Sequence, residues 1–216
     1  PDEAFLLSSE DEEEAQSVFD MLNVEIIHRD IRSLIYRGRL RYSEDLKIRR
    51  MELDHLIESL KDNGFTERID RKSLPDLLKT DAGLFLLYDE ILLLLSRQQN
   101  KDKRRELEKD LQACAIVRGR DQAIWPPQKI FFADDQTISL FDTFGALLPF
   151  ADDLGDQYGE ILRLCLNFSC NIAINYLKLI FKKPNPPLMP RSLSPTLIEW
   201  FEARKAELLV SPQLKQ

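Results

Sequence analysis

The sequence predicts a mainly helical α+β protein with a small antiparallel hairpin. Apolar residues recur at helical spacing over most of the 216 residues. One segment, CAIVRGRDQAIWPPQKIFFADD (residues 114–135), instead contains short apolar runs separated by a turn and a Pro-Pro step. A hydrophobic content of 44% and a charged content of 31% are typical of a chain that folds around a core.

The N-terminal third predicts three helices and a strand. SSEDEEEAQSVFDMLN (residues 8–23) predicts a helix, because a serine can cap it and a run of acidic residues lies at its positive end. VEII (residues 24–27) predicts a short strand. Residues 30–64 predict two helices that separate near residues 38–43, and the second starts at Ser43 and ends at Asn63-Gly64.

Two more helices are expected before the hairpin. Residues 84–95 are apolar except for Asp89 and Glu90, which predicts a buried helix. The run is too short and too charged to cross a bilayer, which needs about 20 apolar residues. Residues 100–114 predict a mixed-charge helix with Leu107 and Leu111 facing inward.

The hairpin is expected to have strands at residues 115–117 and 123–125, joined by a turn at residues 119–122. Two prolines then end the second strand, because proline has no backbone N–H to donate to a ladder. Residues 129–132 predict a third extended piece. We expect Trp125 and Phe150, large aromatic residues beside prolines, to anchor the hairpin in the core.

Residues 160–181 (EILRLCLNFSCNIAINYLKLIF) predict one buried helix with a polar stripe. Its polar residues make a membrane span the less favoured interpretation. The stripe is expected either to bond a neighbouring helix or to line a pocket, and it consists of Arg163, Asn167, Asn171 and Asn175.

The sequence therefore predicts one domain over residues 1–183, a proline-rich connector over residues 184–195 and a C-terminal helix over residues 196–216. The helix is expected either to pack back on the domain or to stay free. Since the chain begins with Pro1, we expect it to be a piece of a longer protein.

Charge argues against general nucleic-acid binding, because the net charge is −7. Residues 29–50 are locally basic, however, with eight Lys and Arg against three Asp and Glu. A solvated helical surface is the favoured interpretation. The alternative is an interaction site for phosphate or an acidic partner, made by Arg32, Arg37, Arg39 and Arg41.

No motif predicts a catalytic, cofactor or metal site. The sequence contains no Gly-rich phosphate loop and no Gly-x-Ser-x-Gly elbow. Each histidine follows a glutamate by three residues, but Glu25 and His28 fall in an expected strand, where they would face opposite sides. Three cysteines without metal spacing predict reduced, buried thiols in a cytoplasmic protein.

The hairpin segment also resembles a recurring segment of very large proteins of the sacsin and NO VEIN type. The shared layout is a helix, a short strand (residues 114–117), a turn with Arg120 and Asp121, an aromatic-Pro-Pro step, a strand (residues 130–132) and a Leu-Leu-Pro-Phe-x-Asp element (residues 147–152). Residues 12–35 are similar to that family's helix and Leu-Gly-Val strand unit, with Asn23 in place of the glycine.

Members of this family start with an ATPase domain of the gyrase/histidine-kinase type, and the shared segment lies beyond it as a structural module. The resemblance implies a non-catalytic structural or protein-interaction module of a chaperone-like or defence-type protein, with a protein partner or other domains of its own chain as partners. Two alternatives stay open: a nucleic-acid-binding module that uses residues 29–50, and an enzyme whose site the sequence does not reveal.

Overall fold

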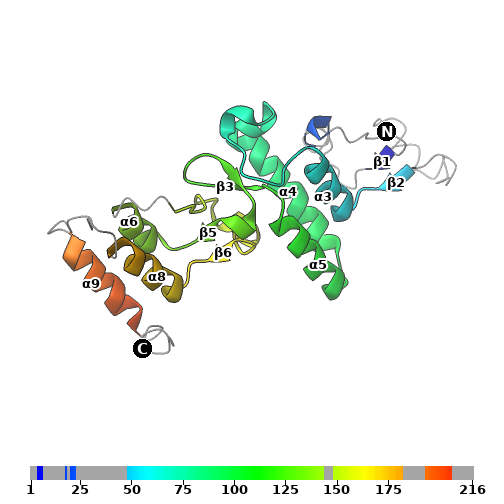
Figure 1. The fold of residues 1–216 in the computed structure, drawn as a ribbon. Helices are drawn as coiled ribbons and strands as arrows, with labels where there is room; N and C mark the ends of the chain where they lie inside the picture. The colour runs from blue at the N-terminus through cyan, green and yellow to red at the C-terminus, as the bar shows by residue number, and fades with distance from the viewer. Residues whose placement is uncertain are drawn as a thin grey trace.

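The computed structural model describes residues 4–6, 18, 20–22, 48–143, 148–181 and 193–205, and the structural statements that follow concern these residues. They form a mainly helical α+β protein with small sheets, as the sequence predicts. Two groups of helices lie on either side of a set of short strands (Figure 1). No helix in the described ranges is long and apolar enough to cross a membrane.

The first group contains α3 (Leu53–Asp62), α4 (Asp81–Arg97) and α5 (Lys101–Gln112). Helices α4 and α5 confirm the expectations for residues 84–95 and 100–114, and Leu107 and Leu111 are buried as predicted. The apolar faces of these helices meet in the larger of two hydrophobic clusters, together with the short helix α7 (Gly159–Leu162). Thr80 caps α4, because its side chain accepts a hydrogen bond from the Gly83 amide.

The start of α3 differs from the prediction. Residues Ile48–Arg50 form strand β2, which pairs in parallel with β1 (Ala4–Leu6), so a helix running from Ser43 is wrong at this point. The helix begins after Glu52, whose amide donates to His55 Nδ1 at 3.2 Å in a capping box. It ends as predicted at Asn63, and Gly64 follows with a φ of +81°, a conformation that favours glycine.

The second group contains α6 (Asp135–Thr143), α8 (Cys170–Phe181) and α9 (Leu193–Ala203). Its core is aromatic. The Phe168 ring packs edge-on against Phe131, Phe141 and Phe150, each with a centroid separation of 5.1 Å. Trp200 of α9 is buried in the same cluster, so the C-terminal helix packs back on the rest of the chain.

The single helix predicted over residues 160–181 is wrong. The chain forms α7, then strand β6 (Leu166–Asn167), and only then α8. Leu166 and Phe168 donate their amides to the carbonyls of Ile130 and Phe132, each at 3.0 Å, so this stretch serves as partner to another strand. The missed signal is Ser169, whose hydroxyl accepts from the Ile172 amide and caps α8.

The predicted hairpin is present. Strand β3 (Val117–Arg118) pairs with β4 (Ile124–Trp125) in antiparallel register, and the amide of Gln122 closes the turn on the Gly119 carbonyl at 2.8 Å. The third extended piece is shorter than expected. A 3₁₀ turn at Pro127–Lys129 precedes β5 (Phe131–Phe132), which pairs in parallel with β6.

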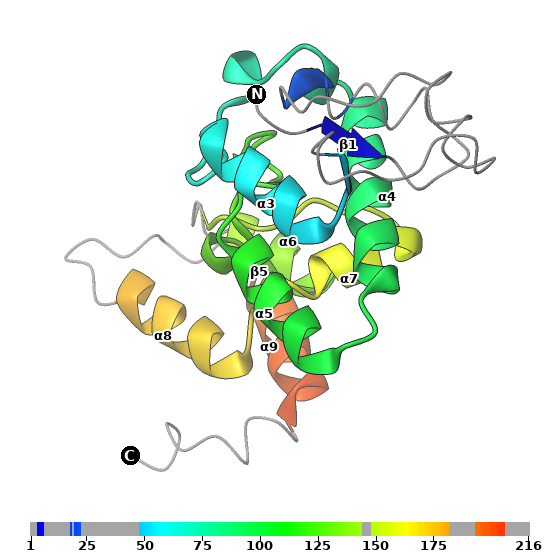
Figure 2. The ribbon, with the colours of Figure 1, turned by 90° about the vertical axis from the view of Figure 1, so that its right-hand side faces the viewer.

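Isolated bridges join these small sheets into one hydrogen-bonded ribbon. At one end Ile69 bridges β4, and near the middle Gly119 bridges Ala151 in antiparallel register. Phe150 in turn bridges β5, which pairs with β6 at the far end. The ribbon therefore runs from the first helical group to the second, with β5 lying behind α5 when the molecule is seen end-on (Figure 2).

Candidate functional site: the hairpin junction

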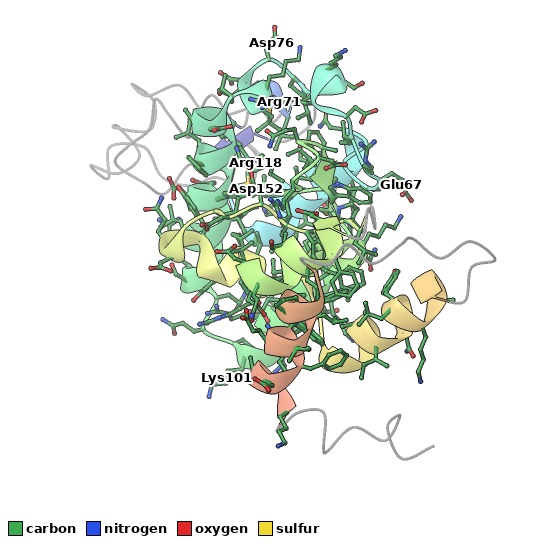
Figure 3. All side chains as sticks on the ribbon, turned by 90° about the vertical axis from the view of Figure 1, so that its left-hand side faces the viewer. Glu67, Arg71, Asp76, Lys101, Arg118 and Asp152 are labelled. Carbon is green, nitrogen blue, oxygen red and sulfur yellow. The ribbon has the colours of Figure 1, made fainter. Side chains whose placement is uncertain are left out.

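Arg118, in the first strand of the hairpin, is the centre of a junction between three parts of the chain. Its guanidinium lies 2.5 Å from the Asp81 carboxylate on α4. It also lies 2.9 Å from the carboxylate of Asp152, and Figure 3 labels both Arg118 and Asp152. The Arg118 side chain is only 12% exposed, so both ion pairs are partly shielded from water. The guanidinium donates a hydrogen bond to Asp81, whereas its Nε faces Asp152 as an ion pair without hydrogen-bond geometry, so Arg118 holds the hairpin near both carboxylates by charge.

An aromatic layer lies next to this ion-pair cluster. The Arg118 amide donates to the Tyr88 hydroxyl at 3.4 Å, and the Tyr88 and Tyr158 rings are 5.2 Å apart. Phe85 stacks on Tyr158 at 5.0 Å. Burial raises the pKa of Tyr88, so its hydroxyl stays protonated and acts as a hydrogen-bonding group rather than as a base.

The turn of the hairpin is organised by Asp121. One carboxylate oxygen accepts from Trp125 Nε1 at 3.0 Å and from the Ala123 amide at 3.1 Å. The other oxygen accepts from Arg68, whose guanidinium lies 5.3 Å from the centre of the Trp125 ring. Gly119 is required here by space, because a Cβ atom would come within 2.6 Å of Asp121 Oδ1 and 2.8 Å of the indole.

The Leu-Pro-Phe-x-Asp element lies against the same hairpin. The Phe150 carbonyl accepts from the Arg120 amide at 3.0 Å, and the Asp152 amide donates to the Arg118 carbonyl at 2.9 Å. On its other side, Pro149 accepts from the Phe131 amide at 2.8 Å. Two parts of the segment that carries the resemblance, the hairpin and residues 148–152, are therefore brought together in space.

The junction combines ion pairs with a buried aromatic layer, and two free cysteines are buried in the same hydrophobic cluster as that layer. Within the described ranges no group of three or more His, Cys, Asp and Glu side chains could hold a metal ion. Burial raises the pKa of the Cys114 thiol to about 11 and that of Cys165 to about 12, which keeps both as thiols rather than nucleophilic thiolates at neutral pH. Arg118 pairs with Asp81 and Asp152, and Asp121 pairs with Arg68.

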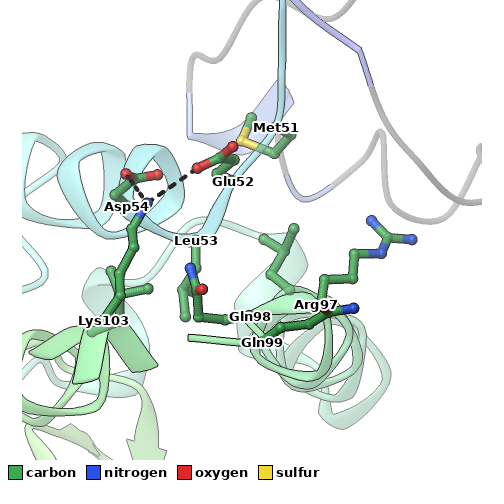
Figure 4. Close-up of a pocket in the computed structure, with 10 residues that line it drawn as sticks. Met51, Glu52, Leu53, Asp54, Arg97, Gln98, Gln99 and Lys103 are labelled. Atoms are coloured by element: carbon green, nitrogen blue, oxygen red, sulfur yellow. Dashed lines mark hydrogen bonds and ion pairs between the residues drawn. The ribbon is translucent and has the colours of Figure 1, made fainter. Parts of the chain in front are cut away.

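A separate pocket of about 560 Å³ lies between the start of α3, the end of α4 and α5 (Figure 4). Lys103 stands at its wall, 3.3 Å from Glu52 and 3.5 Å from Asp54. The hydrogen bond with Glu52, followed by the nearby Asp54 charge, raises the pKa of Lys103. The amine is therefore held protonated, and it is not prepared to act as a base or to form a Schiff base.

The predicted polar stripe does not form. Arg163 follows α7 and Asn167 lies in β6, whereas Asn171 and Asn175 belong to α8. Arg163, Asn167 and Asn175 are exposed, so none of the three is a buried polar group that bonds a neighbouring helix. Arg163 lines a groove, which is described below.

The other predicted interaction residues lie outside the described residues. These are the four arginines Arg32, Arg37, Arg39 and Arg41. Sequence reasoning missed the pairing of Arg118 with Asp81, because no local pattern links a strand residue to a helix start 37 positions earlier. Asp152 could have been identified from the sequence as a residue of this junction, since it belongs to the element that carries the resemblance.

Comparisons of the chain with protein-family models, with curated proteins and with solved structures found no match.

Proposed function

We propose that the chain is a non-catalytic structural and protein-interaction module of a larger cytoplasmic protein, chaperone-like or defence-type, that carries an ATPase domain of the gyrase/histidine-kinase type. The observation that carries the proposal is the hairpin junction. Arg118, Asp121 and Asp152 belong to the segment that resembles the sacsin and NO VEIN type, and each makes internal contacts in the junction.

Such engagement favours a structural role over a catalytic one. A catalytic acid, base or nucleophile needs a pKa suited to proton transfer and access to a substrate. Asp121 instead has a lowered pKa, since hydrogen bonds from Trp125, Ala123 and Arg68 outweigh the effect of its partial burial. The free, buried cysteines Cys114 and Cys165 favour a reducing compartment, which supports the cytoplasmic assignment.

The test compares the natural protein with the 216-residue chain. We expect the intact mass of the natural protein to exceed that of the chain severalfold and the natural protein to hydrolyse Mg-ATP. Isothermal titration calorimetry of the chain alone should give no heat of binding with Mg-ATP, because no phosphate loop is present in its sequence. A natural protein of only 216 residues, or micromolar nucleotide binding by the chain, would refute the proposal.

A further inference from the structure

A groove of about 310 Å³ lies between α5 and the end of α7, and Leu95 of α4 also lines it. Helices α5 and α7 are seen side by side in Figure 2. Four cations and two carboxylates line it: Arg104, Arg105, Lys109, Arg163, Glu108 and Glu160. We call this set the α5–α7 groove. Its excess of positive charge contrasts with the net charge of −7 of the whole chain.

Arg104 fixes the shape of the groove. Its Nε donates to Glu108 at 2.9 Å within α5, and Nη2 donates to Glu160 of α7 at 3.2 Å. The hydrogen bond with Glu108 is the main reason why the pKa of Arg104 is raised. A second tie crosses the groove, because the Gln112 side chain donates to the Leu164 carbonyl at 3.0 Å. The two walls are thereby held together before any ligand arrives.

The three remaining cations are exposed and available. Lys109 and Arg163 form no ion pair within the part of the chain that the structure describes. Arg105 lies 3.8 Å from Asp102, but both side chains are more than three-quarters exposed, and pairs of this kind contribute little. An anionic ligand would therefore gain charge-assisted hydrogen bonds without breaking the ties that Arg104 makes.

We infer that the α5–α7 groove binds an acidic peptide segment of a protein partner, with Arg105, Lys109 and Arg163 as the recognising groups. The inference rests on the proposed role as an interaction module and names the kind of partner. Peptide carboxylates are favoured over nucleic-acid phosphates for two reasons. The groove is small, so a short peptide can keep its carboxylates within it, and a long polyanion would extend over the rest of a chain whose net charge of −7 repels it.

The probe is a fluorescein-labelled nine-residue peptide of alternating Glu and Ser, titrated with the chain and followed by fluorescence anisotropy. We expect saturable binding that weakens with added salt, because exposed charges are screened over about 8 Å at physiological ionic strength. The triple variant Arg105→Gln, Lys109→Gln, Arg163→Gln should bind at least about tenfold more weakly, since it loses three charge-assisted contacts. All three side chains are exposed, so its melting temperature should stay unchanged.

A matched variant controls for net charge. Lys72→Gln, Lys178→Gln, Lys205→Gln removes the same charge from exposed positions outside the groove and should bind the peptide as the unmodified chain does. A peptide with Gln in place of Glu should not bind. Absence of binding, or equal losses in both triple variants, overturns the inference. Tighter binding of a nine-nucleotide single strand that depends on the groove residues also overturns it and identifies a nucleic-acid site. These outcomes are independent of the tests of the proposed function, which measure the intact mass of the natural protein and the binding of Mg-ATP by the chain.

Discussion

Trp125 and Phe150 both stand beside prolines, yet their surroundings differ. Phe150 is 2% exposed within the aromatic cluster, which confirms the expectation that it is a core anchor. Trp125 is only partly buried: one face lies under Arg68 and its Nε1 donates to Asp121. The indole therefore stabilises the turn of the hairpin as much as the core.

We expect Phe150→Ala to lower the free energy of unfolding by about 3 to 4 kcal/mol, because it leaves a cavity among packed rings. Trp125→Ala should cost less, about 2 kcal/mol, since part of its surface already faces water. Urea denaturation measures both. Trp125→Phe serves as a matched control that removes the hydrogen bond to Asp121 and should cost about 1 kcal/mol. Equal losses for the two alanine variants would contradict this ranking.

The hydrogen bonds of the Asp121 carboxylate predict that the hairpin loses stability in acid. Burial alone would raise the pKa of Asp121, but the hydrogen bonds from Trp125, Ala123 and Arg68 lower it below the ordinary value of 3.8. Its stabilising contribution is therefore complete above the unfolded-state pKa and is lost as the pH falls through 3.8 towards the folded-state pKa. Melting temperatures measured from neutral pH down to acid should fall more steeply in the unmodified chain than in Asp121→Asn. Parallel curves for the two proteins would exclude this role for Asp121.

At the scale of elements, α9 is attached to α6 by one cluster of side chains. Trp200 Nε1 donates to Thr137 Oγ1 at 2.9 Å, and the Arg204 guanidinium lies 4.7 Å from the Trp200 ring. Arg204 also pairs with Asp134, which accepts from the Thr137 amide at the start of α6. The buried indole of Trp200 and the ion pair between Arg204 and Asp134 therefore hold the C-terminal helix against α6.

Trp200→Ala should release α9 while the first helical group stays folded. Hydrogen exchange is expected to accelerate over Leu193–Ala203 and at the facing start of α6, but not in α4 or α5. Ile198→Ala is the matched control, because Ile198 lies on the same helix and is 55% exposed. If Ile198→Ala increased exchange as much as Trp200→Ala, the anchoring role of the indole would be wrong.

At the scale of the whole molecule, the two hydrophobic clusters are joined by the hydrogen-bonded ribbon. Cys114 and Cys165 both lie in the larger cluster, at 0% and 9% exposure. Burial in these apolar surroundings is the main reason why the pKa values of both thiols are raised. The thiols should therefore report on the integrity of this cluster.

Pulsed alkylation with iodoacetamide at neutral pH, read by peptide mass spectrometry, should leave Cys114 and Cys165 unmodified in the native chain and modify both in denaturant. Mild conditions that release α9 should not expose them, because they belong to the other cluster. Native modification of Cys114 at the rate of a free thiol would contradict the buried environment described here.

The amino-acid sequence by itself determined the fold class, the helices α4 and α5 and the central hairpin. These features depend on local information: helical spacing of apolar residues, a turn beside prolines, and capping residues such as Asn63-Gly64. Such signals act within a few residues of one another, and neighbours in the sequence are sufficient to express them.

Only the tertiary structure decided where residues 163–169 and Ile48–Arg50 belong. Both stretches have helical patterns, but each supplies backbone hydrogen bonds to a distant strand, Phe131–Phe132 or Ala4–Leu6. The pairing of Arg118 with Asp81 and the groove beside Arg163 depend in the same way on long-range packing. A local pattern cannot specify these features, because the partner that stabilises them lies tens of residues away in the chain and meets them only when the helices pack.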